Sequence, residues 1–230
     1  MTLKKTAQLT LSLKLEDEAN FENFIDSGLN AEILSELKGK APMIFLWGSA
    51  GAGRTHLLQS VCHRALMRNE PSIYVPLSNA EKFSPEILLG IDAMDAICLD
   101  DIHAIQQKPN WEEALFKLYN KVIRSESRLI ISATQSPKEL KFTLADLQSR
   151  LSALPVFKLS KLDDSGQIAV LKHRANRRGM DLSDSIAEFI WRRAQRSMHD
   201  IINVLDVLDA ISLEEKRRIT VPLIKKAMNW

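Results

Sequence analysis

The sequence predicts an α/β protein in which a parallel sheet, covered by helices on both faces, precedes a small α-helical domain. Two observations lead to this prediction. From Phe21 to about Leu159, short apolar stretches typical of buried strands alternate with helical stretches, and such alternation indicates a mainly parallel sheet. After Asp163, the apolar spacing is helical only, which indicates that the sheet has ended.

The expected elements follow from this pattern in chain order. Strands are expected at residues 43–47, 72–76, 96–99, 129–133 and 156–159, and later helices at 167–178, 183–196 and 199–212. A last short helix is expected after Thr220. Residues 1–17 differ from both parts, because leucines alternate with polar residues there before an acidic run, as in an extended segment. We therefore expect an extended peptide over 1–17, an αβα domain over 18–162 and a helical domain over 163–230.

Composition excludes several classes of protein. Basic and acidic residues nearly cancel, 31 against 29, which disfavours a protein dedicated to coating nucleic acid. Cys62 and Cys98 both lie in apolar stretches, which favours buried thiols in a reducing compartment over a disulfide or a metal site. Polar residues interrupt the N-terminal apolar pattern before a signal sequence forms, and no stretch approaches the length of a membrane span. We expect a cytoplasmic protein with no membrane partner.

The segment GSAGAGRT matches the phosphate-binding pattern GxxxxGK[ST] except at Arg54, where the pattern has Lys. It stands between an expected strand and an expected helix, the order that the motif requires. Its glycines let main-chain N–H groups turn toward phosphate oxygens, and the helix that follows adds the positive end of its dipole. Thr55 offers a hydroxyl to Mg²⁺. Arg54 would supply a fixed positive charge, but its guanidinium is wider than a lysine ammonium, so the loop predicts nucleotide binding more directly than turnover. The expected nucleotide-binding residues are Gly48, Ser49, Ala50, Gly51, Ala52, Gly53, Arg54, Thr55 and His56.

Two carboxylates, Asp100 and Asp101, end the apolar stretch 96–99. Next to a phosphate-binding loop, one carboxylate at this place orients Mg²⁺ and its neighbour polarises the attacking water. We assign Asp100 to Mg²⁺, together with Thr55, and Asp101 to the water. Thr134, which follows the strand expected at 129–133, is the candidate for contact with the terminal phosphate. The alternative for the acidic pair is a solvated strand end before a turn.

Arg150, in the stretch DLQSRL just before the last expected strand, has two interpretations. It is either an ordinary surface ion-pair partner or a guanidinium that reaches a phosphate held by a neighbouring molecule and stabilises charge in the transition state. Spacing alone does not decide between them.

Taken together, GSAGAGRTHLL, LDDI, SATQSP, DLQSRL and the helical C-terminal part resemble the AAA+ ATPases, and within them the bacterial replication initiator DnaA. The resemblance covers residues 18–230, including FENFIDSGLNAEIL. It implies an AAA+ P-loop αβα domain followed by an α-helical lid domain. It also implies that Asp100 and Asp101 are the Walker B pair, that Thr134 is at the sensor 1 position and that Arg150 is the arginine finger.

The sensor 2 position departs from the family pattern. It holds His199 in place of an arginine, and a histidine is mostly neutral near pH 7. Arg196 lies three residues earlier on the same expected helix face and is the alternative cofactor-binding residue. His199 as an ordinary surface residue near a helix start also stays open.

The N-terminal stretch QLTLSL resembles the sliding-clamp-binding peptide of DnaA-related regulatory inactivators. In such peptides a glutamine enters a polar pocket and apolar residues fill a cleft, so the resemblance assigns clamp binding to Gln8, Leu9, Leu11 and Leu13. Ser12 stands where related motifs often have Pro, and an ordinary edge strand would show the same alternation.

The resemblance implies a regulatory function. The protein would hold ADP (or ATP) with Mg²⁺, be tethered to the DNA polymerase III sliding clamp (beta subunit), and stimulate ATP hydrolysis by DnaA, which prevents re-initiation of replication. Arg54 and His199 imply weak or no ATPase activity of its own. We expect a homodimer or higher oligomer, with DNA contacted only indirectly or weakly.

Two rival functions remain. An autonomous AAA+ ATPase acting as a helicase loader would leave the stretch 8–13 without a role. A DNA-binding initiator paralogue is disfavoured by the small net charge and because the chain ends where DnaA would continue into a helix-turn-helix domain.

Overall fold

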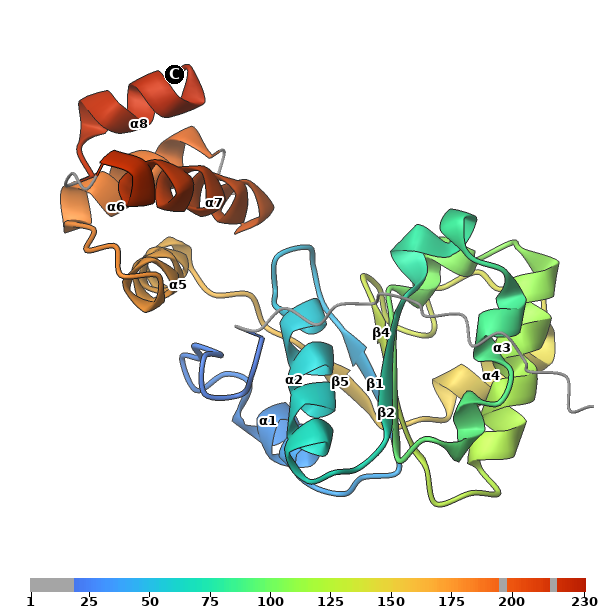
Figure 1. The fold of residues 1–230 in the computed structure, drawn as a ribbon. Helices are drawn as coiled ribbons and strands as arrows, with labels where there is room; N and C mark the ends of the chain where they lie inside the picture. The colour runs from blue at the N-terminus through green and yellow to red at the C-terminus, as the bar shows by residue number, and fades with distance from the viewer. Residues whose placement is uncertain (1–18, 195–197, 216–218) are drawn as a thin grey trace, which may run out of the picture.

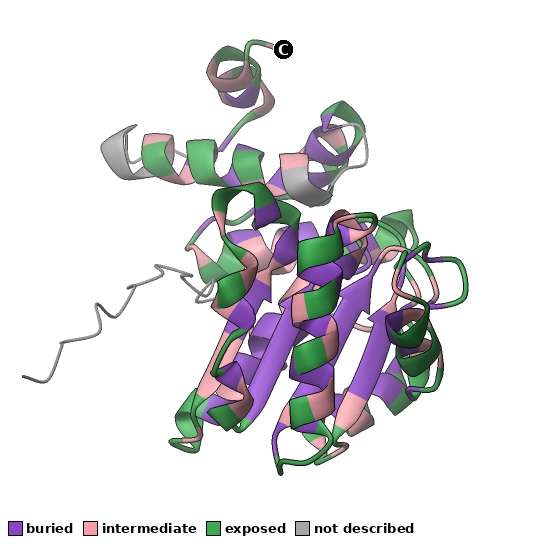
Figure 2. Cartoon of the chain, turned by 90° about the vertical axis from the view of Figure 1, so that its right-hand side faces the viewer, coloured by how far each residue is buried: buried purple, intermediate pink, exposed green. Residues whose placement is uncertain are grey.

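The computed structural model describes residues 19–194, 198–215 and 219–230, and its centre is a parallel sheet of five strands. The strands are β1 (Met43–Trp47), β2 (Ser72–Pro76), β3 (Ala96–Asp100), β4 (Arg128–Ala133) and β5 (Val156–Lys158). Their order across the sheet is β2-β3-β4-β1-β5, and every pair is parallel. All residues of β3 are buried, as are the central residues of β1, because helices cover both faces of the sheet (Figure 2).

Helices lie on both faces of this sheet (Figure 1). One face carries α1 (Ala31–Lys38) and α2 (Arg54–Met67), and the other carries α3 (Pro109–Val122) and α4 (Ala145–Ser152). The remaining turns of this part are the 3₁₀ helices η1 (Leu77–Lys82), η2 (Pro85–Leu88), η3 (Ile91–Ala93) and η4 (Ile102–Ile105). The expectation of an α/β fold with a parallel sheet is confirmed.

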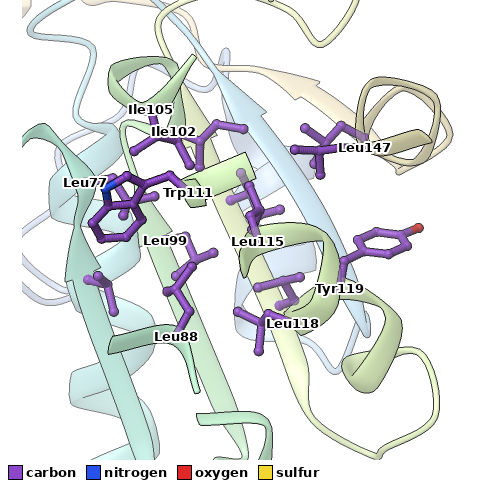
Figure 3. Close-up of a cluster of buried hydrophobic side chains, with 14 of the residues drawn as sticks. Leu77, Leu88, Leu99, Ile102, Ile105, Trp111, Leu115, Leu118, Tyr119 and Leu147 are labelled. Atoms are coloured by element: carbon purple, nitrogen blue, oxygen red, sulfur yellow. The ribbon is translucent and has the colours of Figure 1, made fainter. Parts of the chain in front are cut away.

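Each face of the sheet has its own hydrophobic core. Beneath α3 and α4, Leu99 of β3 belongs to one buried cluster with Leu115, Leu147 and Trp111 (Figure 3). Beneath α1 and α2, the second core includes Cys62 and Cys98, which are both buried and not joined in a disulfide. Burial raises the pKa of the Cys98 thiol, with a hydrogen bond to Cys62 contributing. The expectation of buried thiols is confirmed.

The helical part forms a third core of its own. It consists of α5 (Asp164–Arg177), α6 (Asp184–Arg193), α7 (Met198–Glu215) and α8 (Val221–Met228). Leu171, Ile190, Trp191 and Leu205 are among the buried residues that hold it together. These four helices lie away from the sheet, beside the N-terminus of α2 (Figure 1). Within the described ranges no helix is long and apolar enough to cross a membrane.

Side-chain caps fix where three of these helices begin. Asp163 accepts a hydrogen bond from Gly166 N–H, Ser183 from Ile186 N–H and Thr220 from Leu223 N–H. Because of the Asp163 cap, α5 begins three residues before the expected start. The other expected elements differ from the observed ones by a few residues at their ends.

Candidate nucleotide site

The loop between β1 and α2 has the conformation that its glycines predict. Gly51 and Gly53 have φ of 76° and 98°, in the left-handed region, and Gly53 is the N-cap of α2. A Cβ on Gly53 would lie 2.7 Å from Cε2 of Phe24, and one on Gly48 would lie 2.7 Å from the carbonyl oxygen of Leu159. Side chains are thus excluded at both positions, so the main chain of the loop comes close to its neighbours before the N-terminus of α2, an arrangement that suits anion binding.

Arg54 makes contacts within the protein. Its Nη2 lies 2.7 Å from Oδ1 of Asp101, and its Nη1 donates to the carbonyl oxygen of Gly48. The guanidinium is buried, and its Nε has no partner among the described residues. The sequence predicts a phosphate contact for Arg54. The structure instead places its charge against Asp101, because the planar fork reaches two acceptors at once where a lysine ammonium is a single point charge.

Asp100 is a buried carboxylate held by hydroxyl groups. Thr55 donates to its Oδ2 at 2.6 Å, Tyr74 donates to the same oxygen at 2.9 Å, and the Ser132 hydroxyl donates to Oδ1. Burial, and then the nearby charge of Asp101, raise the pKa of Asp100 above its usual 3.8, while the three hydroxyl groups lower it. Burial, and after it the charges of Asp100 and Asp101, raise the pKa of the Tyr74 phenol.

The contact between Thr55 and Asp100 suits a Mg²⁺ ion. A hydroxyl and a carboxylate are ligands that Mg²⁺ uses when phosphate and water oxygens complete its octahedron. No group of three or more His, Cys, Asp or Glu side chains that suits a metal occurs in the described part of the chain. An ion at Thr55 and Asp100 would therefore depend on phosphate and water for its other ligands.

Ser132, which no motif indicates, lies closer to the carboxylates than Thr134 does. Its hydroxyl donates to Asp100 and accepts from the main-chain N–H of Asp101 at 3.0 Å. Leu99 pairs with Ile131 across β3 and β4, so the following residues, Asp100 and Ser132, are neighbours. The available signal was a serine inside an otherwise apolar strand.

Thr134 lies one residue beyond β4, half-buried, and its N–H donates to Nδ1 of His103 at 3.4 Å. That nitrogen is 3.8 Å from Oδ1 of Asp101. Thr134 and Asp101 thus both lie near the His103 ring, at the edge of the sheet where the phosphate loop lies.

A cavity of about 70 Å³ adjoins the phosphate loop. Gly51 to Gly53 form one wall, Phe24 and Ile25 a second, and Gln167, Val170 and Arg174 of α5 a third. The cavity therefore lies where the segment before α1, the loop and the helical part meet.

His56 joins the parts around this cavity. Its Nε2 lies 2.7 Å from the carbonyl oxygen of Asn20, and Nη2 of Arg174 lies 3.5 Å from its Nδ1. A carbonyl oxygen only accepts, so Nε2 carries the hydrogen and Nδ1 faces the arginine as an acceptor. His56 therefore has a place beside the expected nucleotide, whereas Gln167 and Arg174 lie on an ordinary amphipathic helix and carry no sequence signal.

Arg150 is exposed on α4, which packs on the same face of the sheet as α3 (Figure 1). Its side chain has no ion pair or hydrogen bond to any residue that the structure describes. Among the described residues, Arg150 therefore has no acidic partner of the kind that the ion-pair interpretation expects. The Arg150 guanidinium is exposed to solvent.

Several expected site residues fall elsewhere. Gln8, Leu9, Leu11, Leu13 and Arg196 lie outside the described residues. His199 is the second residue of α7, and its side chain is likewise outside the description.

Comparisons with protein families agree with this architecture. The model of the bacterial DnaA ATPase domain matches residues 15–155, and the model of the Hda lid domain matches residues 164–228. The chain belongs to the DnaA-like AAA+ family. Its helical part is a lid domain of the Hda type. The expected AAA+ fold with a helical lid, and the resemblance to DnaA and its relative Hda, are confirmed.

Individual relatives of this DnaA-like protein cover nearly its whole length. An uncharacterized protein of Haemophilus influenzae is 37% identical over 228 residues, covering 96% of this chain and 98% of the relative. Domain III of DnaA from Thermotoga maritima superimposes with a TM-score of 0.77 at 19% identity, covering 94% and 98% of the two chains. AMPPCP-bound DnaA from Aquifex aeolicus has a TM-score of 0.67 at 22% identity, covering 88% of this chain and 69% of that one. At these identities the two structures show the shared fold.

Proposed function

We propose that this DnaA-like protein holds ADP as a structural ligand and stimulates ATP hydrolysis by DnaA, with Arg150 as the group that acts on its partner. The observation that carries the proposal is the contrast between two arginines. Arg54 is buried against Asp101 within the chain, whereas Arg150 is exposed and has no ion-pair partner in the described part. The contact of Arg54 with Asp101 disfavours hydrolysis in the chain's own nucleotide site. The exposed Arg150 leaves a positive charge available for the nucleotide site of another molecule.

The chain's own site supports binding without turnover. Main-chain N–H groups of the loop and the start of α2 would hold the phosphates, and Thr55 and Asp100 would hold Mg²⁺. Bound Mg²⁺ supplies neutralising charge between the phosphates. Asp101, the candidate for polarising water, already accepts a hydrogen bond from Arg54 at 2.7 Å. One of its oxygens is thus occupied, which disfavours an autonomous ATPase.

The partner's site would receive Arg150. An arginine supplied in trans stabilises the charge that develops on the transferred phosphoryl group and accelerates hydrolysis by about 10³ to 10⁵ in enzymes that use one. Residues 8–13 would tether the protein to the sliding clamp, which raises its local concentration near DnaA without a new contact. The cytoplasm, where these partners would meet, is part of the same proposal.

The first test is Arg150→Ala. We expect this variant to lose the stimulation of DnaA, by about a hundredfold or more, in an assay of phosphate release with DnaA, ATP and clamp loaded on DNA. Arg124→Ala is the matched control, because Arg124 is also exposed but follows α3 on another part of the surface. It should stimulate DnaA as the wild type does.

Two further measurements separate the roles. Arg150→Ala should keep nucleotide and clamp binding, while Gln8→Ala should lose clamp binding and keep nucleotide. The proposal is wrong if Arg150→Ala stimulates DnaA normally, or if the purified wild-type chain alone hydrolyses ATP at the rate of an ordinary ATPase.

A further inference from the structure

Glu112 is a buried carboxylate in the first turn of α3. It lies on the buried face of this helix together with Leu115 and Tyr119, and only 1% of it is exposed. Glutamates are almost never buried to this extent unless their oxygens have partners. The next residue, Glu113, faces solvent and pairs with Lys117 at 2.6 Å, as is usual on a helix surface. The burial of Glu112 therefore depends on specific partners.

Both oxygens of Glu112 accept hydrogen bonds, and the donors come from two separate segments. Oε1 accepts from the main-chain N–H of Gln107 at 2.7 Å. Oε2 accepts from the Thr143 hydroxyl at 2.7 Å and from the main-chain N–H of Leu144 at 2.8 Å. Glu112 thus forms a bridge between the turn before α3 and the start of α4.

One end of this bridge is anchored in the core of the sheet domain. Gln107 follows shortly after η4, whose Ile102 and Ile105 are fully buried (Figure 3). Gln106 adds a second tie, because its Oε1 accepts from the main-chain N–H of Lys141 at 2.5 Å. The turn after η4 therefore holds the segment before α4 at two points.

The other end of the bridge is the start of α4, the helix that carries Arg150. Leu144 is the N-cap of α4, and its own side chain makes no capping hydrogen bond. Only Leu147 and Leu151 of this helix are buried. In a capping box, a glutamate of the same helix accepts from the N–H of the N-cap residue. Glu112 takes this role from a different helix, so the start of α4 is fixed by α3.

We propose that Glu112 is a positioning residue for Arg150, because it fixes the start of α4 and thereby the place from which the guanidinium reaches the partner's nucleotide. Helix α4 is only about two turns long and moves as one unit, so a shift at Leu144 is carried to Arg150. Misplacing a catalytic group by about 1 Å can cost on the order of a hundredfold in rate. This inference rests on the proposed action of Arg150 on DnaA and adds the residue that holds it in place.

Glu112→Gln tests the bridge, because an amide has one acceptor oxygen where a carboxylate has two. Whichever way the amide is turned, its NH₂ group would face a main-chain N–H, and one end of the bridge is released. The assay measures phosphate release by DnaA, with ATP and clamp loaded on DNA, at rising concentrations of the full chain. We expect the maximal rate to fall about tenfold, with the concentration for half-maximal stimulation unchanged. A simple loss of folded protein would raise that concentration and leave the maximal rate as it is.

Glu113→Gln is the matched control, because it makes the same change one residue along, on the exposed side of α3. It should keep the maximal rate. A second pair of variants acts on the other partner in the bridge. Thr143→Val removes one donor and should lower the maximal rate by less than Glu112→Gln does, whereas Thr143→Ser keeps the hydroxyl and should keep the rate. If Glu112→Gln does not fold, equal maximal rates for the two Thr143 variants overturn the inference.

Hydrogen exchange reads the start of α4 directly. In Glu112→Gln, peptides that contain Leu144 should exchange faster than in the wild type, while those of β3 and β4 should not change. An unchanged maximal rate in Glu112→Gln, when Arg150→Ala has lost stimulation, overturns positioning by Glu112 and leaves the action of Arg150 standing. Normal stimulation by Arg150→Ala overturns the proposed function and this inference with it.

Discussion

Asp100 is the residue whose ionisation connects the stability of the protein to ligand binding. It is buried in β3, with its oxygens held by Thr55, Tyr74 and Ser132. Burial is the largest cause of its raised pKa, so folding without a metal shifts Asp100 toward the protonated form relative to the unfolded chain. A cation beside this carboxyl would favour the charged form instead. Mg²⁺ binding and proton release at Asp100 are therefore coupled.

Asp100→Asn tests this coupling. A group whose pKa is raised on folding contributes stability that is fully present below its unfolded pKa, near 3.8 here, and is lost as the pH rises through the folded pKa. Without Mg²⁺ and nucleotide, the wild type should lose stability relative to Asp100→Asn as the pH rises above the unfolded pKa of 3.8. At neutral pH the variant should then be more stable, by on the order of 1 kcal/mol. Thermal unfolding between about pH 5 and about pH 8 measures the difference.

The exposed Asp181 provides the control for that measurement. Asp181→Asn should leave the free energy of unfolding within about 0.5 kcal/mol of the wild type, as is usual for a surface substitution. Mg²⁺ should strengthen ADP binding to the wild type and not to Asp100→Asn. A variant that is less stable than the wild type at neutral pH without Mg²⁺ would show that the three hydroxyl donors stabilise the charged carboxylate more than burial disfavours it.

At the scale of single residues, the sequence predicts chemistry where a motif fixes spacing. Thr55, Asp100 and Asp101 come together as the motif implies, because a strand, a loop and a neighbouring strand hold them at one edge of the sheet. Ser132 and Glu112 escape prediction. Ser132 depends on the register of two strands that are distant in sequence, and Glu112 on donors that come from two separate segments.

At the scale of elements, the start of α2 depends on the absence of a side chain at Gly53, its N-cap residue. Gly53 combines two constraints, a φ of 98° and the close approach of Phe24. Gly90 has only the constraint of a positive φ, because its φ is 80° and a Cβ there would meet nothing within 4 Å. The two glycines therefore separate the cost of backbone strain from the cost of steric overlap.

Gly53→Ala and Gly90→Ala should differ in stability accordingly. Gly90→Ala should lower the free energy of unfolding by about 1 kcal/mol, the cost of a left-handed conformation with a side chain. Gly53→Ala should lower it by roughly 2 to 4 kcal/mol, because the new methyl group must also displace the Phe24 ring. Urea denaturation measures both. Equal losses would mean that the segment before α1 moves aside freely and does not form a fixed wall of the cavity.

The sequence predicts these elements best where apolar runs are long. The five strands are found within a residue or two of their observed ends, because a parallel sheet buried on both faces needs continuous apolar stretches. The helix α4 is not predicted around Arg150. Its eight residues bury only Leu147 and Leu151, and two apolar positions are too few to define a helical period.

At the scale of the whole molecule, the three hydrophobic cores are not equally closely connected. The two cores of the sheet share its strands, whereas the lid packs around a core of its own. Between lid and sheet domain, His173 Nε2 lies 3.5 Å from Asn23 Oδ1, and Arg174 lies 3.5 Å from His56. Polar contacts at this distance are weaker than buried apolar packing. The lid should therefore open from the sheet domain at a lower free energy than either part unfolds.

Hydrogen exchange tests this view of the molecule together with the place of the nucleotide. Without ligand, amides of α5 to α8 should exchange faster than those of β1, β3 and β4, because the core of the lid is smaller than the two cores that share the sheet. ADP with Mg²⁺ should slow exchange in α5, which lines the cavity, far more than in α8, which contributes no residue to it. Mass spectrometry of peptides from each helix separates the two effects. Unchanged exchange in α5 would place the nucleotide outside this cavity, and equal slowing in all four helices would mean that the lid responds as one rigid unit.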